Sequence, residues 1–188
     1  MTEIREPVHF TGWIDEHKHL LKPPVGNKAL YGDSADLIVM VVGGPNSRQD
    51  YHYEPYEEWF YQIKGNMHVN IITPEGKPRR IDIREGETWM LPGNTPHSPQ
   101  RPEEGSIGLV VEKVRSEGTL EKFRWYSHTG EDAELVYEVE LQVTDIVKDL
   151  PPVFQDFYAK LDAGEFKRAD GTPVTRDELS PVPRAQSA

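Results

Sequence analysis

The chain of 188 residues contains no cysteine. This absence excludes disulfide bonds, thiolate nucleophiles, zinc ribbons and cysteine-bound iron–sulfur clusters. Any metal ion would therefore have to be held by histidine and carboxylate side chains.

Basic residues are scarce, with Lys and Arg numbering 21 against 32 Asp and Glu, for a net charge of −11. We therefore expect no nucleic-acid partner, because phosphate contacts need a basic face. No apolar run approaches the roughly 18 residues of a membrane span, so we expect no membrane partner. The first ten residues also lack the basic start and apolar centre of a signal peptide. We expect a cytoplasmic protein.

Short apolar segments between Gly- and Pro-containing turns predict an all-β fold, because many short strands with regular turn signals are typical of a sandwich or barrel. The expected strands are 36–42, 58–65, 67–73, 79–85, 87–92, 106–114, 123–127 and 135–143. Helices are expected at 10–20 and 153–166. Residues 163–188 are polar and contain prolines, so we expect them to form a mobile tail behind a domain of residues 1–162.

Two spaced motifs predict a metal site. Residues 44–65 have the pattern G…H-x5-E-x6-G, with His52 and Glu58, and residues 86–97 have the pattern G-x5-P-x4-H, ending at His97. In a small β-barrel, a strand end carrying a histidine can hairpin into a strand carrying a glutamate, and a later histidine can arrive from a neighbouring strand. Two imidazoles and one carboxylate leave coordination positions open, as in non-haem Fe(II) oxygenases.

Three nearby glutamates could supply the carboxylate. Strand alternation predicts that Glu58 points inward together with Phe60 and Gln62, whereas Glu57 points outward. The six-residue gap to the following glycine also favours Glu58. We expect Glu54 to be a solvated acid of the preceding loop.

Another histidine pair, His17 and His19, belongs to the expected N-terminal helix. Side chains two positions apart on a helix point about 200° from each other, so these two cannot easily share one metal ion. We interpret them as surface residues.

Arg48 and Arg101 each lie four residues from a proposed ligand in an otherwise acidic chain. Two guanidinium groups beside a metal ion would make an anion site suited to a carboxylate, which arginine binds in bidentate fashion. Glu112 ends an apolar strand, and by itself this position is as compatible with a surface acid as with a site residue.

Both motifs resemble those of cupins, with two departures. Glu54 stands where the first cupin motif usually has a second histidine, and Arg101 stands where the second motif usually has an asparagine. Five segments together resemble the 3-hydroxyanthranilate 3,4-dioxygenase family over roughly residues 8–160. They read "WIDEHKHLLKPPVGN", "VVGGPNSRQDYH", "EEWFYQIKGNM", "LPGNTPHSPQRP" and "DLPPVFQDFYA".

The resemblance implies a cupin-type antiparallel β-barrel (jelly roll) that uses one Fe(II) per chain and O2 to open the ring of 3-hydroxyanthranilate. The product, 2-amino-3-carboxymuconate semialdehyde, cyclises to quinolinate, which implies a place in the tryptophan (kynurenine) pathway towards NAD. The implied metal ligands are His52, Glu58 and His97. The implied substrate-binding residues are Arg101, Glu112, Glu58, Asn27 and Phe60. The implied dioxygen and catalytic residues are Arg48 and Asp50.

The resemblance also implies a homodimer. Many bacterial members of the family carry a second, structural iron held by two cysteine pairs near the C-terminus, which this cysteine-free chain cannot hold. Two alternatives to the dioxygenase remain open. One is a cupin isomerase or hydrolase that uses zinc or manganese as a Lewis acid, and the other is a cupin sensor that binds a small carboxylate without turnover.

Overall fold

The computed structural model describes residues 4, 6–22, 26–32, 36–144 and 146–180. Helix α1 (Phe10–His17) precedes the strands, and helix α2 (Ile146–Asp162) and the 3-10 helix η1 (Arg176–Leu179) follow them. The strands are β1 (Asn27–Ala29), β2 (Leu37–Gly43), β3 (Tyr51–Tyr53), β4 (Glu58–Lys64), β5 (Met67–Ile72), β6 (Pro78–Ile83), β7 (Thr88–Leu91), β8 (His97–Gln100), β9 (Ile107–Lys113), β10 (Glu121–Ser127) and β11 (Glu134–Leu141).

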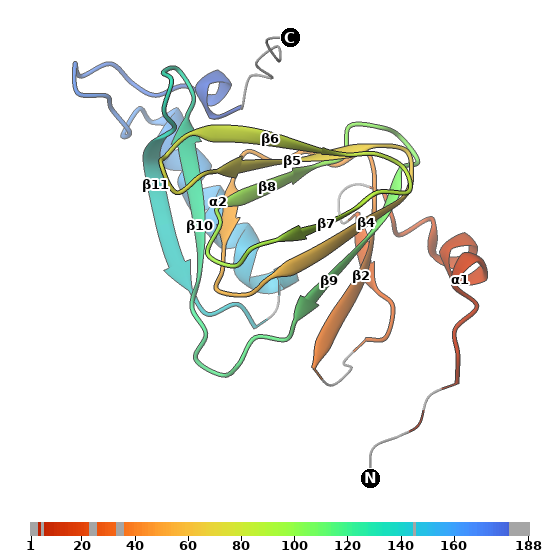
Figure 1. Cartoon of the computed structure of the whole chain (residues 1–188). Coiled ribbons are helices and arrows are strands. Elements are labelled where there is room, and N and C mark those ends of the chain that lie inside the picture. Colours follow the sequence, from red (N-terminus) through yellow and green to blue (C-terminus); the bar gives the residue numbers. More distant parts are fainter. Residues whose placement is uncertain (1–3, 5, 23–25, 33–35, 145, 181–188) are drawn as a thin grey trace.

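The strands form two antiparallel sheets, as Figure 1 shows. One sheet has the order β1-β2-β9-β4-β7 and the other has the order β11-β10-β3-β8-β5-β6. Strands adjacent in each sheet are mostly distant in sequence, which is the connectivity of a jelly roll rather than of a meander. The expected all-β, cupin-type fold with an N-terminal and a C-terminal helix is confirmed.

The apolar core fills the space between the two sheets. Its buried members come from both sheets and are Val42, Phe60, Met67, Val69, Ile71, Ile83, Leu91 and Val110. Along β4, Glu58, Phe60 and Gln62 are buried, whereas Trp59 and Tyr61 are half-buried. The alternation predicted from the sequence is therefore confirmed, and it directs the Glu58 carboxylate into the interior.

Helix α2 lies behind β10 and β11 in the view of Figure 1 and packs on the face of β10 that carries Phe123 and Trp125. Phe157 and Leu161 pack there against Phe123 and Trp125 in a second apolar cluster. The helix begins seven residues before the expected start, so Pro151 and Pro152 lie inside it rather than ahead of it. It ends at Asp162 rather than at 166.

Gly164 accounts for the earlier end of α2, because its φ of 69° lies in the left-handed region that terminates helices. Beyond it, residues 165–180 return to the barrel. Val174 and Leu179 are buried in the second apolar cluster, and the His128 amide donates to the Glu178 carbonyl. These contacts join residues 165–180 to β10, whereas residues 181–188 of the expected tail lie outside the described residues; the mobility of the tail stays a prediction. The domain boundary itself stays a prediction.

Of the residues that the structure describes, no helical stretch has both the length and the apolar character that a bilayer crossing requires.

Candidate metal centre

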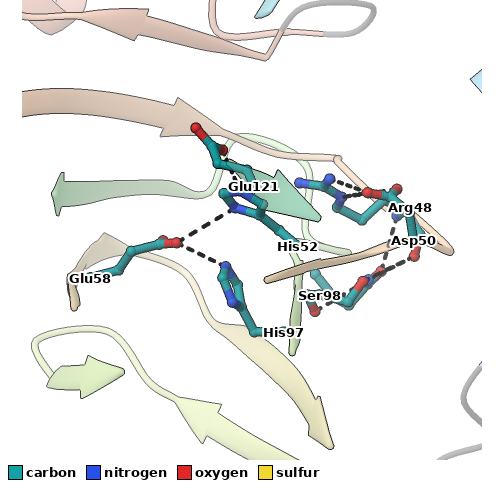
Figure 2. Close-up of polar contacts among 8 residues, drawn as sticks. Arg48, Asp50, His52, Glu58, His97, Ser98 and Glu121 are labelled. Carbon is teal, nitrogen blue, oxygen red and sulfur yellow. Dashed lines mark hydrogen bonds and ion pairs between the residues drawn. The ribbon is translucent and has the colours of Figure 1, made fainter. Parts of the chain in front are cut away.

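His52, Glu58 and His97 converge inside the barrel from three strands (Figure 2). Their ligand atoms all lie within 4.8 Å of one another. His52 on β3 and His97 on β8 are direct antiparallel partners, and Glu58 faces them from β4 in the opposite sheet. Glu58 Oε1 lies 2.8 Å from His97 Nε2 and 3.9 Å from His52 Nδ1.

These three side chains line a cavity of about 260 Å³. Its walls combine polar groups with an apolar surface, as small-ligand sites do. All seven metal- and substrate-site residues implied by the resemblance, together with Arg48, line this cavity: Asn27, Arg48, His52, Glu58, Phe60, His97, Arg101 and Glu112. These eight are all of the residues predicted for the metal, for the substrate and for dioxygen except Asp50.

The outer nitrogen of each imidazole is held by a hydrogen-bond partner. His97 Nδ1 lies 2.9 Å from the Thr95 carbonyl oxygen, so Nδ1 donates to that carbonyl and Nε2 is the nitrogen that faces Glu58 and the cavity. His52 Nε2 lies 2.6 Å from Glu121 Oε2. Partners of this kind orient metal-binding histidines and raise their basicity.

Electrostatics favour a charged Glu58. Burial acts to raise the pKa of Glu58, but His97 and His52 outweigh it and hold the pKa well below its ordinary value. Burial acts to lower the pKa of His97, but Glu58 and the Thr95 carbonyl outweigh it and raise the pKa. For His52, the effect of burial is larger than the opposing effects of Glu121 and Glu58, so the pKa is lowered. The three groups thus form a buried anion–imidazole cluster.

This donor set fits a divalent transition metal. Two imidazole nitrogens and one carboxylate oxygen from separate strands leave the cavity side open, which is the facial arrangement of non-haem Fe(II) sites. The two histidine tautomers are set from outside the cavity, and Glu58 supplies a buried negative charge that a cation would compensate.

Arg101 is a buried cation that lacks a partner. It is 3% exposed, and its Nε and Nη2 atoms have no hydrogen-bond partner. Reciprocal backbone hydrogen bonds of 2.7 Å with Asn46 hold the residue at the end of β8. Burial lowers its pKa to about 10. A buried, unpaired guanidinium group at a cavity wall is suited to an anionic ligand.

Arg48, unlike Arg101, has partners for both its side chain and its backbone. Its guanidinium group pairs with Asp50, which is buried but does not line the cavity. The Gln100 amide donates to the Arg48 carbonyl at 2.8 Å and so anchors the loop. Figure 2 shows the Arg48–Asp50 pair beside His52.

Glu112 and Asn27 also occupy cavity positions. Glu112 is 4% exposed and lies opposite Glu58 on the neighbouring strand, so the surface alternative for it is wrong. Asn27 belongs to the short edge strand β1, where it pairs with Val42. From this edge of the sheet it lines the cavity.

The expectation that Glu54 is a solvated loop acid is wrong. Glu54 is 2% exposed, and its Oε2 lies 2.9 Å from Arg115 Nη2. Burial raises its pKa to about 10 despite Arg115. Unlike Glu58, Glu54 does not line the cavity. The loop folds inward because Arg115 offers the carboxylate a buried partner.

Two charged residues at the site were not predicted from the sequence. Glu121 at the start of β10 bonds to His52, and Arg115 in the loop after β9 pairs with Glu54, Glu112 and Glu121. The only local signal for these ion pairs in the sequence was that Arg115 follows Glu112 by three residues. No pattern connects Glu121 with His52, which lies far earlier in the chain.

The connection from β11 to α2 and the start of α2 contribute further cavity residues that were not predicted, namely Val143, Thr144 and Leu150. Of the other histidines, His17 and His19 use Nδ1 to bond carbonyls of their own helical segment, Trp13 and Glu16. Their interpretation as residues outside the metal site agrees with these contacts.

Comparison with known proteins gives matches over most of the chain. The family model described as 3-hydroxyanthranilic acid dioxygenase matches residues 1–158. A 3-hydroxyanthranilate 3,4-dioxygenase of Burkholderia cenocepacia is 52% identical over 158 residues, which cover 84% of this chain and 87% of the relative. Proteins of the same name from Paraburkholderia phytofirmans and a Jannaschia species are 51% and 54% identical, covering 85% and 82% of this chain and 89% and 84% of the relatives.

Proposed function

Because this chain belongs to the 3-hydroxyanthranilic acid dioxygenase family, we propose that it is a ring-cleaving dioxygenase that converts 3-hydroxyanthranilate and O2 to 2-amino-3-carboxymuconate semialdehyde. The observation that carries the proposal is the shared cavity. The His52–Glu58–His97 cluster and the unpaired Arg101 line the same cavity.

The metal site fits Fe(II), which would be held by His52, Glu58 and His97. When bound there, Fe(II) would supply the chemistry that lets O2 react with the aromatic ring. The chain's own residues supply orientation and charge. The Thr95 carbonyl and Glu121 hold the two imidazole rings with one nitrogen towards the cavity.

Arg101 would bind the substrate carboxylate, since its Nε and Nη2 atoms are buried without a partner. Glu112 would accept a hydrogen bond from the substrate's amino or hydroxyl group, because its carboxylate faces the cavity beside Glu58. Phe60 and Asn27 would bound the ring. With the carboxylate fixed at Arg101, the hydroxyl and amino groups would be directed at the metal.

Arg48 and Asp50 would serve the dioxygen side. Arg48 lines the cavity next to His52, and its pairing with Asp50 fixes the position of its charge. A fixed cation beside the metal would stabilise negative charge that develops on oxygen during the reaction.

The experiment is anaerobic loading with Fe(II), followed by addition of substrate and air-saturated buffer. We expect one O2 consumed per substrate, growth of the semialdehyde absorbance and then its decay as quinolinate forms. Zinc-loaded protein is the matched control and should consume no O2. Substrate loss without O2 uptake would instead indicate an isomerase or hydrolase, and tight binding without turnover would indicate a sensor.

A homodimer and a cytoplasmic location complete the proposal. Strand β7 is an edge of its sheet and exposes Met90, which supports association through this edge. Sedimentation equilibrium tests the dimer, and Met90→Lys should weaken it if β7 is the contact. Quinolinate as the end product would connect the enzyme to tryptophan breakdown and NAD synthesis.

A further inference from the structure

We propose that Arg115 is a positioning residue that links the two halves of the site, holding His52 through Glu121 and the substrate-facing carboxylate directly through Glu112. The inference rests on the proposed iron site and adds to it a residue that belongs to neither of the two sequence motifs. Arg115 lies in the loop between β9 and β10, outside both motifs.

Each part of the Arg115 guanidinium group faces a different carboxylate. Nε lies 2.8 Å from Glu121 Oε1, Nη1 lies 2.7 Å from Glu112 Oε1, and Nη2 lies 2.9 Å from Glu54 Oε2. The three acids come from the start of β10, the end of β9 and the loop before β4. A planar fork with donors in three directions can hold all three, whereas a lysine ammonium group acts as a single point charge.

The first branch leads to the metal ligands. Glu121 uses Oε1 for Arg115 and Oε2 for His52 Nε2, at 2.8 and 2.6 Å. Arg115 therefore fixes the carboxylate that fixes the imidazole ring. Such outer partners typically change metal affinity by about ten- to a hundredfold when removed.

The second branch leads to the substrate side. Glu112 lies opposite Glu58 on the neighbouring strand, and both side chains line the cavity. Arg115 Nη1 binds Glu112 Oε1 and would leave Oε2 for the ligand. Arg115 itself also lines the cavity.

Charge makes this residue hard to replace. In the described part of the chain, Arg115 is the single basic side chain within ion-pair distance of Glu54 and of Glu112, and it shares Glu121 with His52 alone. Removing the cation would leave buried carboxylates uncompensated, and these would lose their present orientation.

The test uses Arg115→Met, Arg115→Lys and Glu121→Gln in the full chain. Fe(II) affinity is measured anaerobically by competition with a chromogenic chelator, separately from kcat and KM. We expect Arg115→Met to weaken Fe(II) binding about ten- to a hundredfold and also to raise KM. Arg115→Lys should lie between wild type and Met. Glu121→Gln should weaken Fe(II) binding with little change in KM, because it removes the His52 branch alone.

A double variant separates positioning from general damage. In the Glu121→Gln background, Arg115→Met should cost much less further iron affinity than it does in wild type, while its effect on KM persists. The matched control is Arg124→Met. Arg124 has a similar side-chain exposure, 18% against 14% for Arg115, and pairs with Glu138 outside the cavity. This control should keep wild-type iron affinity and KM.

Wild-type iron affinity and KM in both Arg115 variants would overturn the inference, as would equal losses in Arg124→Met or additive losses in the double variant. If Arg115→Met does not fold, Arg115→Lys and its combination with Glu121→Gln decide by the same criteria. Wild-type protein that binds no Fe(II) would overturn the proposed iron site and the inference together. Wild-type binding with unaffected Arg115 variants would overturn the inference alone.

Discussion

Glu58 of β4 and Glu112 of β9 lie directly opposite each other in the sheet, with their buried carboxylates facing one cavity. Like charges in direct cross-strand positions are destabilising. Here each acid has its own cation or imidazole, because Glu58 lies 2.8 Å from His97 and Glu112 lies 2.7 Å from Arg115. The arrangement separates a metal-facing acid from a substrate-facing acid within one pair of strands.

The choice of Glu58 as the carboxylate ligand leads to the first prediction. His52→Ala, Glu58→Ala and His97→Ala should each lose iron and activity together, because each removes one of three protein ligands. Glu54→Gln should keep its iron, because Glu54 does not line the cavity and glutamine preserves its shape. Metal analysis of the purified, iron-loaded variants measures this. Full iron occupancy in Glu58→Ala, or its loss in Glu54→Gln, would transfer the ligand role to Glu54.

Arg101 provides the second prediction. A charge-assisted bond to the substrate carboxylate is worth roughly 1.5–3 kcal/mol, and its loss would leave a buried anion unpaired. Arg101→Ala should therefore raise KM about ten- to a hundredfold, at 1.4 kcal/mol per factor of ten, with unchanged iron content. Lysine should restore part of the loss, because a point charge cannot reproduce the planar fork.

The matched substrate control for Arg101 is 2-aminophenol, which keeps the two metal-binding groups but lacks the carboxylate. Wild type should use it poorly, and Arg101→Ala should use it about as well as wild type does. If the variant loses as much on 2-aminophenol as on 3-hydroxyanthranilate, Arg101 acts on the metal, the oxygen or the fold instead of on the carboxylate.

The third prediction concerns iron stoichiometry. The three groups of residues that could hold a metal ion among those described share Glu58, His52 or Glu54, so they overlap in one place. With no cysteine for a second centre, purified protein should bind at most one iron per chain and show no thiolate-to-iron absorption. Two tightly held irons per chain would require a site formed by other residues.

The packing of the C-terminal segment supplies the fourth prediction. Leu179 is 0% exposed in the cluster beneath α2. Leu179→Ala should lower the free energy of unfolding by about 2–5 kcal/mol, through lost burial and the cavity left behind. Leu120→Ala, at a leucine that is 52% exposed, should change it by less than about 0.5 kcal/mol. Urea titrations of both variants test this, and equal small effects would mean that the segment adds nothing to stability.

His128 yields a prediction about pH. Burial lowers its pKa to about 4, against about 6.5 in the unfolded chain, so between these values the unfolded state binds more protons. Unfolding free energy should then rise with pH across this window and level off above it. His128→Gln should remove this rise with pH. The unfolding free energy of the variant should therefore increase relative to that of wild type as the pH falls through this window. Exposed His19, changed to Gln, is the control. Parallel profiles for wild type and His128→Gln would contradict the assignment.

The sequence alone was enough to predict the fold class and to propose the three ligands, because both depend on local patterns. Alternation along β4 directs Glu58 inward whatever its neighbours are, and Gly and Pro positions mark the ends of strands. The helix α2 was foreseen, but not its start before Pro151 and Pro152. Strands β1, β3 and β8 were not foreseen, since three or four residues rarely show a period of two, although β7, which is as short, was expected at 87–92.

The tertiary structure alone decided which charges meet behind the ligands. Glu54 resembled a solvated acid because nothing near it in the sequence offers a partner, yet Arg115 reaches it from the loop after β9. Glu121 binds His52 from a strand that pairs with β3 only once the sheet is assembled. Ion pairs and burial depend on distances between strands remote in the chain, and these distances are set by sheet order rather than by local sequence.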